Sequence, residues 1–305
     1  MPKPKIIIVG NLLKKGVTET INSMRDWLSS QVEILREIPL ETLRHDTKQN
    51  CSAEIPEKFE AIQDAKLCLV FGGDGTLLAT ARALGKLKIP LLGVNMGKLG
   101  YLAEYSEEGL RDNLANVLAD KVKIQKRMMM NVKIRSAMGD TIFQSLAANE
   151  IAISAGHPFR MIDLRVDQGN LQVARYLGDG IILSTPTGST GYNMAAGGPI
   201  LQPTLRAFIL TPIAPHSLSL RPMVLEPDLP IKIVPSSLNI GTSIIVDGQL
   251  PHKLCEGETI EITPAKCSMQ LYPHPNRAWF KILSTKLQYG VSPHHQNGNN
   301  DSYPL

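Results

Sequence analysis

The chain has 305 residues, enough for two domains, and 43% of them are hydrophobic, which supports sizeable cores. The formal net charge is +4 with no dense Lys/Arg block, so an anionic small molecule explains the charge more simply than a nucleic acid. The four cysteines form no CxxC pair, which argues against a zinc site or a disulfide framework. No apolar run reaches the length of a signal or membrane-spanning segment, so we expect a cytoplasmic protein that does not bind membranes.

The first part of the chain alternates short apolar runs with helical patterns. Strands are predicted at Ile6–Val9, Lys66–Phe71 and Pro90–Val94, and helices at Glu19–Ser29, Leu77–Leu84 and Glu107–Ala119. Strands that alternate with helices form parallel sheets with both faces covered. We therefore expect a Rossmann-like α/β domain over residues 1–123.

A glycine-rich turn, Gly72-Gly73-Asp74-Gly75-Thr76, joins the second predicted strand to a helix. This order aims free backbone N–H groups and the positive end of a helix dipole at one point, which suits a phosphate. A carboxylate beside a phosphate repels it unless a cation or a reacting hydroxyl lies between them. The turn therefore predicts phosphoryl transfer, with Asp74 as a base or a metal ligand. The simpler alternative is a tight bend with no ligand.

From about Ile124 the pattern changes to the two-residue period of half-buried strands. Such runs occur at Asn131–Arg135, Ile162–Asp167, Pro230–Pro235, Ser243–Val246 and Thr259–Thr263. Sixteen of the 21 prolines fall in residues 151–305. Many short strands separated by Pro and Gly predict an all-β, sandwich-like domain over residues 124–275. We expect the helical pattern in 276–291 to return to the first domain, and the polar tail 292–305 to be disordered.

Two further segments have the composition of ligand-binding loops. In Gly178–Pro199, a short apolar strand is followed by small and hydroxyl residues that let a ligand approach the backbone, and Tyr192 offers a stacking surface. A flexible linker is the alternative. Asn149-Glu150 stands at the mouth of an apolar strand and suits a ribose diol. Both side chains reach one ligand only if the chain bends there, and a solvated strand end is the alternative.

Three other features have weaker links to function. In the loop Pro215–Pro222, a structural role for His216 is favoured over a catalytic one. Asp247-Gly248-Gln249 is typical of a hairpin turn, with a ligand contact by Gln249 as the alternative. Arg160 and Arg175 are phosphate partners only on the basis of charge, with a solvated surface as the alternative.

Taken together, these segments resemble the NAD kinases, which phosphorylate NAD to NADP. The resemblance depends on four blocks in order, Gly72–Thr76, Asn149-Glu150, Gly178–Pro199 and Pro215–Pro222. The glycine turn alone also occurs in diacylglycerol-kinase-like and phosphofructokinase-like enzymes, whereas the block Ser184–Tyr192 is much more specific. Where relatives commonly have Thr-Ala-Tyr, this chain has Thr190-Gly191-Tyr192.

The resemblance implies roles for particular residues. Asp74 would accept the proton of the 2′-hydroxyl on the adenosine ribose of NAD, and Asn149 and Glu150 would hold ribose hydroxyls. Arg160 and Gln249 stand where the family often has ligand contacts. The full set of implied NAD-binding residues is Asp74, Gly75, Asn149, Glu150, Arg160, Asp179, Thr187, Thr190, Gly191, Tyr192, Asn193, Ala195 and Gln249.

The resemblance also implies the partners of the reaction. ATP or polyphosphate would donate the phosphoryl group, and a divalent cation, Mg²⁺, would arrive with the donor because the sequence offers no all-protein metal cage. A homodimer or homotetramer is expected, in which a site can borrow residues from a neighbouring subunit. Two alternatives stay open. One is a lipid or sugar kinase with the same glycine turn, and the other is a non-catalytic module that senses dinucleotides.

Overall fold

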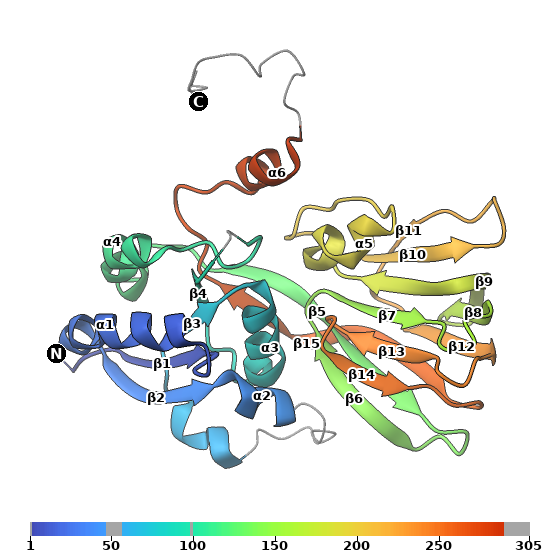
Figure 1. Cartoon of the computed structure of the whole chain (residues 1–305), viewed down its shortest axis with the longest axis horizontal. Coiled ribbons are helices and arrows are strands. Elements are labelled where there is room, and N and C mark those ends of the chain that lie inside the picture. Colours follow the sequence, from blue (N-terminus) through green and yellow to red (C-terminus); the bar gives the residue numbers. More distant parts are fainter. Residues whose placement is uncertain (1, 47–56, 98–99, 290–305) are drawn as a thin grey trace. The chain divides into compact units, whose positions relative to one another are not determined.

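The structure is a computed structural model that describes residues 2–46, 57–97 and 100–289 (Figure 1). Its contacts divide the chain into two units, residues 1–273 and residues 274–305. Cys68, Cys255 and Cys267 are free thiols, whereas Cys51 and the predicted tail 292–305 lie outside the described residues. None of the described helices combines the length and the apolar character needed to cross a bilayer.

The N-terminal lobe of the first unit is the predicted parallel sheet, with strand order β2-β1-β3-β4 (Figure 1). Its elements are β1 (Lys5–Gly10), α1 (Lys15–Gln31), β2 (Glu33–Pro39), α2 (Leu40–Asp46), η1 (Glu57–Ile62), β3 (Leu67–Gly72), α3 (Asp74–Leu84), η2 (Gly85–Leu87), β4 (Leu91–Asn95) and α4 (Glu107–Leu118). The three predicted strands and three predicted helices are confirmed within a few residues at each end. Strand β2 and helix α2 were not predicted.

Side chains that alternate along the strands supply two separate cores, one on each face of this sheet. Ile6 and Ile8 of β1 pack in the core that α1 and α4 cover. Ile7 and Val9 pack in the core that α2 and α3 cover. Because both faces are covered, the strands β1, β3 and β4 are apolar along nearly their whole length, as a buried parallel sheet requires. Helix α3 starts directly after the carboxyl end of β3, where the glycine turn lies.

The C-terminal lobe of the same unit consists of the predicted antiparallel strands and short turns, with one core. Its elements are β5 (Gln125–Arg135), β6 (Thr141–Ala147), β7 (Glu150–Ser154), β8 (Ile162–Gln168), β9 (Leu171–Ser184), η3 (Thr187–Thr190), α5 (Tyr192–Ala195), β10 (Phe208–Pro215), β11 (Met223–Leu225), β12 (Ile231–Ser237), β13 (Ser243–Val246), β14 (Leu250–Lys253) and β15 (Thr259–Leu271). All five predicted period-two strands are confirmed. The fold is therefore an α/β lobe followed by a β-rich lobe.

The two lobes share backbone hydrogen bonds. Strand β15 pairs along β5 and reaches β4 at Leu271 and Leu91, which makes one sheet of 15 strands (Figure 1). The neighbouring residues Met129 and Met130 of β5 lie in the cores of the two different lobes. Because the lobes form one compact unit, a domain boundary at residue 123 stays a prediction, although β5 does begin at Gln125.

Helix α6 (Trp279–Leu287) belongs to the second unit and covers the predicted helical stretch Ala278–Gln288. Ile282 and Leu283 are its buried residues. The return of residues 276–291 to the first lobe stays a prediction.

Candidate active site

The carboxylate of Asp74, the first residue of α3, is held by three backbone amides of the loop after β4. The N–H of Tyr101 donates to Oδ2 at 2.7 Å, and those of Leu102 and Ala103 donate to Oδ1 at 3.0 and 3.1 Å. Asp74 is half-buried and the preceding Gly73 is exposed. A carboxylate offers about four acceptor positions. With two bonds on Oδ1 and one on Oδ2, these contacts leave an acceptor position on Oδ2 for a ligand.

Two glycines make this arrangement sterically feasible. A Cβ on Gly100 would lie 1.9 Å from Asp74 Oδ1, so the loop reaches the carboxylate only because Gly100 has no side chain. A Cβ on Gly72 would lie 2.3 Å from Thr76 Oγ1, so the turn closes over Thr76 for the same reason. The bend and the held carboxylate therefore need glycine at particular positions.

Buried Arg127 adds a positive charge near Asp74. Arg127 is 4% exposed, and burial lowers the pKa of its guanidinium while the carboxylates of Glu104 and Asp74 oppose this effect. Burial, followed by the negative charge of Asp74, raises the pKa of the Tyr101 phenol. Backbone amides and the Arg127 guanidinium thus lie close to the Asp74 carboxyl group.

The chain bends at Asn149, immediately before β7, as two side chains that serve one ligand require. The bend is held by Asp247 of the β13–β14 turn. Its Oδ1 accepts the N–H groups of Asn149 at 2.7 Å and Glu150 at 3.1 Å, and its Oδ2 accepts that of Ala148 at 3.1 Å. The backbone of the Asn149-Glu150 pair is therefore fixed by the Asp247 carboxylate.

The predicted loop after β9 packs directly against this bend. The N–H of Thr185 donates to the carbonyl of Asn149 at 2.8 Å. A Cβ on Gly188 would lie 2.3 Å from that same oxygen, and one on Gly191 would lie 2.8 Å from Glu150 Oε2. The structure thus brings together two blocks that are more than 30 residues apart in the sequence. Glycine in place of the usual alanine at position 191 leaves room beside Glu150.

Three buried polar atoms at this junction have no hydrogen-bond partner among the described residues. They are Asn149 Oδ1, Glu150 Oε2 and Thr187 Oγ1. Buried polar groups are almost always paired, and an unpaired one costs free energy. Because all three belong to the predicted site, they are well suited to a polar ligand such as a sugar.

Burial gives Glu150 unusual acid–base behaviour. Desolvation is the larger cause and the negative charge of Asp247 the smaller one. Together they raise the pKa of the Glu150 carboxyl from 4.5 to about 8, and the backbone N–H of Tyr192 opposes the shift. The raised pKa favours the protonated carboxyl near neutral pH, and this form of Glu150 can donate as well as accept a hydrogen bond.

This pKa predicts how stability depends on pH. Between pH 4.5 and about 8 the folded chain holds a proton on Glu150 that the unfolded chain has lost. The free energy of unfolding should therefore fall as pH rises, by up to about 1.4 kcal/mol per pH unit from this group. Urea titrations at pH 5 to 9 should show Glu150→Gln gaining stability over the wild type across this window. A difference that does not change with pH contradicts the assignment.

Two predicted ligand residues use their side-chain amides within the protein instead. Asn193 is fully buried; its Nδ2 donates to the carbonyls of Ser189 and Pro199, and its Oδ1 accepts from Thr211 Oγ1 at 2.7 Å. A side-chain contact from Asn193 to NAD would break this network, so the structure gives it a bracing role. Gln249 donates from Nε2 to the carbonyl of Gly75 at 2.8 Å and accepts from Arg82.

Four other predicted residues belong to the loop after β9 and differ in their exposure to solvent. Thr187 is buried, Thr190 is half-buried, and Tyr192 and Ala195 are exposed on α5 beside Glu150. Gly75 is half-buried next to Gln249, and a Cβ there would lie 3.1 Å from Gln249 Nε2. These positions agree with one site that includes both the glycine turn and the loop.

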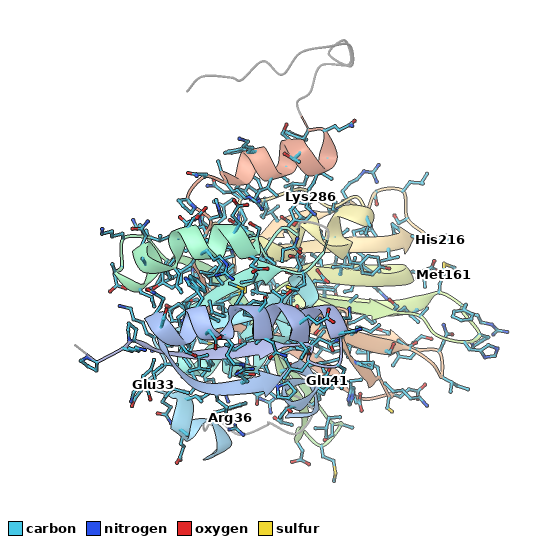
Figure 2. All side chains as sticks on the ribbon, turned by 60° about the vertical axis from the view of Figure 1, so that its left-hand side comes forward. Glu33, Arg36, Glu41, Met161, His216 and Lys286 are labelled. Atoms are coloured by element: carbon cyan, nitrogen blue, oxygen red, sulfur yellow. The ribbon has the colours of Figure 1, made fainter. Side chains whose placement is uncertain are left out.

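Arg160 and Asp179 lie elsewhere in a single chain. Glu150 pairs with Ser184 at one end of β7, whereas Ser154 pairs with Gly180 at the other. Asp179 is thus about 16 Å along β9 from Ser184, at about 3.3 Å per residue. The exposed Arg160 follows the same far end of β7, and exposed His216 donates its backbone N–H to Leu177 there. Figure 2 shows His216 and Met161 at this end.

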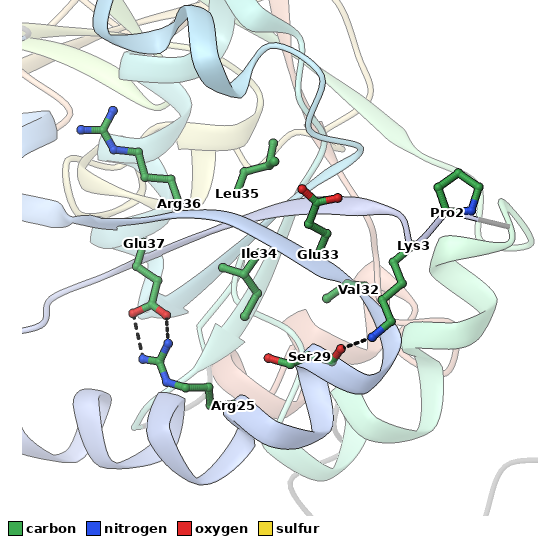
Figure 3. A pocket seen from close by; sticks show the side chains of 10 residues that line it. All are labelled: Pro2, Lys3, Arg25, Ser29, Val32, Glu33, Ile34, Leu35, Arg36 and Glu37. Atoms are coloured by element: carbon green, nitrogen blue, oxygen red, sulfur yellow. Dashed lines mark hydrogen bonds and ion pairs between the residues drawn. The ribbon is translucent and has the colours of Figure 1, made fainter.

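The structure places two further features away from the predicted chemistry. Arg175 makes an exposed ion pair with Asp163 on the neighbouring strand, so it contacts a carboxylate rather than a free site. A cavity of about 860 Å³ lies along the edge strand β2, where Arg25 pairs with Glu37 and Lys3 donates to the carbonyl of Ser29 (Figure 3). No predicted site residue lines it.

Metal-binding side chains are sparse in the part of the chain that the structure describes. Within residues 2–46, 57–97 and 100–289, no three His, Cys, Asp or Glu side chains lie together as metal ligands would.

Sequence reasoning missed the residues that connect these parts. Arg82, Arg127, the amides of residues 101–103 and the carboxylate of Asp247 were not predicted to act here. Arg82 has one available signal, since it is the basic residue of a helix whose other side chains after Thr76 are apolar or small.

Known proteins resemble this chain over most of its length. Family models of the ATP-NAD kinase N-terminal domain and the ATP-NAD kinase C-terminal domain match residues 6–122 and 148–274. An NAD kinase of Heliobacterium modesticaldum is 34% identical over 288 residues, which cover 94% of this chain and 99% of the relative. An NAD kinase of Trichlorobacter lovleyi is 40% identical over 228 residues, which cover 74% and 79%.

Solved structures show the same architecture. A yeast NADH kinase complexed with NADH matches with a TM-score of 0.82 at 23% identity, covering 97% of this chain and 91% of that one. An NAD kinase from Archaeoglobus fulgidus in complex with ATP matches with a TM-score of 0.68 at 26% identity, covering 93% and 98%. The fold, the glycine turn, the bend at Asn149 and the curated relatives lead to one conclusion. The chain belongs to the NAD kinase family.

Proposed function

We propose that this chain transfers the terminal phosphoryl group of ATP or polyphosphate to the 2′-hydroxyl of the adenosine ribose of NAD, giving NADP. One observation carries the proposal beyond family membership. Gln249 binds the carbonyl of Gly75 in the glycine turn, and Asp247 in the same hairpin binds the amides of Asn149 and Glu150. The phosphate-type turn and the ribose-type pair are therefore held to one short segment, as a kinase that acts on a sugar hydroxyl requires.

The contacts of Asp74 support the catalytic role proposed for it. The amides of residues 101–103 fix its carboxylate and leave an acceptor position on Oδ2. A ribose hydroxyl bound there would be oriented toward a phosphate above the exposed N-terminus of α3. Phosphoryl transfer passes through a loose transition state, so positioning matters more than early deprotonation. Asp74 would accept the hydroxyl proton late in the reaction.

A divalent cation is part of the proposal. We infer that Mg²⁺ enters with the donor, because the described side chains form no metal cage. When bound, it would neutralise charge on the donor phosphates. Asp74 is the acidic residue of the glycine turn, and its Oδ2, which accepts from the N–H of Tyr101, would be a protein oxygen able to contact the cation.

The experiment combines the purified protein with NAD and either ATP or polyphosphate, and scores NADP formation and donor consumption. NADP formation with saturable dependence on NAD supports the proposal, and the two donors are compared directly. Turnover only with lipid or sugar alcohols would identify the related kinase class instead. Saturable NAD binding without turnover would identify a dinucleotide-sensing module.

We further propose that the active protein is a homodimer or homotetramer whose site includes residues of a second copy. Arg160 and Asp179 lie at the far end of β7 from Glu150, so one chain does not bring all predicted residues together. Apolar side chains are exposed at that end, with Phe159 at 72% and Leu218 at 89%. Contiguous apolar surfaces mark protein interfaces, and in the proposed assembly these two side chains would be covered by the second copy.

Subunit mixing tests this assembly. Asp74→Asn and Asp179→Asn should each be inactive alone, because each removes one half of a shared site. After the two variants are mixed under conditions of subunit exchange, about a quarter of the wild-type activity should return, since half of the dimers are mixed and each has one intact site. Light scattering should show a dimer or larger. Mixtures that stay inactive while exchange is demonstrated would contradict a shared site.

A further inference from the structure

Arg82 and Asp247 form a buried ion pair that the reaction as described does not use. Arg82 Nη1 lies 2.7 Å from Asp247 Oδ2, and the two side chains are 1% and 0% exposed. Arg82 is on α3, about 12 Å along the helix from Asp74 at 1.5 Å per residue. Asp247 is in the β13–β14 turn of the other lobe. The pair therefore links the helix of the glycine turn to the β-rich lobe.

The Asp247 carboxylate makes further contacts that fix its position between the two lobes. Its carboxylate also accepts the amides of residues 148–150, so it satisfies the bend before β7 and Arg82 at the same time. Its backbone has φ of +47° and that of Gly248 +65°, which is a conformation that L residues rarely adopt. Asp-Gly pairs favour this conformation in hairpin turns, and the four bonds to the Asp247 carboxylate fix the turn against the bend before β7 and against Arg82.

Gln249 completes a continuous chain of contacts. Its Oε1 accepts from Arg82 Nη2, and its Nε2 donates to the carbonyl of Gly75 at 2.8 Å. The path runs from Asn149 through Asp247, Arg82 and Gln249 to Gly75. Each end of this path is a predicted contact of the substrate. We call Arg82, Asp247 and Gln249 the strut.

Stability alone does not account for two buried charges. Replacing a buried ion pair with apolar residues is often neutral or stabilising, because desolvation offsets the attraction. A pair that joins two parts of a site instead specifies their spacing, and an error of about 1 Å in that spacing costs about 100-fold in rate. We propose that Arg82 and Asp247 are positioning residues, an inference that rests on the proposed function. They hold the glycine turn and the Asn149-Glu150 pair at the distance at which both can contact one nucleotide sugar.

The test replaces Arg82 with Met, which keeps the length of the stem and removes the guanidinium. Arg82→Met should raise the KM and Kd for NAD at least about tenfold and lower kcat, in protein shown by circular dichroism to be folded. Arg82→Lys keeps a charge opposite Asp247 but has no fork to reach Gln249 as well, so its values should lie between those of Met and wild type. The matched control is Arg111→Met on the surface of α4, which should behave as wild type.

The readouts separate positioning from structure. A merely structural role would lower the unfolding midpoint and leave KM and kcat of the folded protein unchanged. Removing one partner of a buried pair destabilises a fold, so Arg82→Met needs a second variant beside it. This variant is Gln249→Leu, at the half-buried end of the strut. We expect it to raise the KM for NAD severalfold. Wild-type KM and kcat in Arg82→Met, or in Gln249→Leu if the first variant does not fold, overturn the proposal.

Failure of the proposed function can be told apart from failure of the strut. If the wild type binds NAD but forms no NADP, the proposed function fails, and the Kd for NAD by calorimetry still tests positioning. In that case a Kd in Arg82→Met equal to the wild-type value overturns the strut. A wild type that does not bind NAD overturns both.

Discussion

The Asp74→Asn variant is expected to bind NAD and to lose at least about 100-fold, and up to about 10⁴-fold, in the rate of NADP formation. The amide cannot accept the proton of the ribose hydroxyl. It also has a single acceptor oxygen, whereas the carboxylate uses both of its oxygens for the amides of Tyr101, Leu102 and Ala103. The variant therefore loses the base and one of its anchors. Initial rates and the Kd for NAD measure the two effects separately.

The control for this variant is Asp64→Asn, which makes the same chemical change at an exposed position of the same lobe. It should have wild-type activity. An Asp74→Asn enzyme as active as Asp64→Asn would remove Asp74 from the mechanism. Loss of NAD binding together with activity would instead make Asp74 a binding residue.

The Gly100→Ala variant is expected to lose about 100-fold in activity although every predicted catalytic group is still present. The new methyl carbon would lie 1.9 Å from Asp74 Oδ1 and 2.9 Å from Oδ2. Atoms do not approach that closely, so either the carboxylate or the loop must move. A displacement of about 1 Å is enough to misalign the hydroxyl and the donor phosphorus. Steady-state kinetics, with circular dichroism to confirm folding, measure the effect.

Gly97→Ala is the matched control in the same loop. A Cβ at Gly97 meets no atom of the described residues within 4 Å, so this variant should keep wild-type activity. Equal activity of the two alanine variants would show that the contact between residues 100–103 and Asp74 does not position the carboxylate.

The parts of the fold that could be predicted are those with strong local patterns. Strands β1, β3 and β4 are apolar runs next to amphipathic helices, and the period of two is clear in β8 and β12. Strand β2 was not predicted because it is an edge strand with the mixed sequence Glu-Ile-Leu-Arg-Glu-Ile-Pro. Its strand conformation comes from pairing with β1, a tertiary contact that local propensity does not encode.

The candidate site shows the same division between local and long-range information. The Asp247-Gly248 dipeptide predicted a hairpin turn, and the turn is confirmed between β13 and β14. That its carboxylate pairs with Arg82, 165 residues away, cannot be found by any local pattern. The resemblance implies that Asn193 contacts NAD, whereas the three hydrogen bonds of its buried side chain to other parts of the protein could not be predicted from any local pattern.

The central claim is that Asp74 directs the adenosine ribose of NAD to a donor phosphorus. The most direct test is to determine which oxygen of the product carries the transferred phosphate. The purified protein is incubated with NAD and ATP carrying a labelled γ-phosphate, and the product is examined by phosphorus NMR and mass spectrometry. We predict that the label appears as a monoester on the 2′-oxygen of the adenosine ribose, and that Asp74→Asn forms almost none. Label on another hydroxyl, or label released only as inorganic phosphate, would contradict the account.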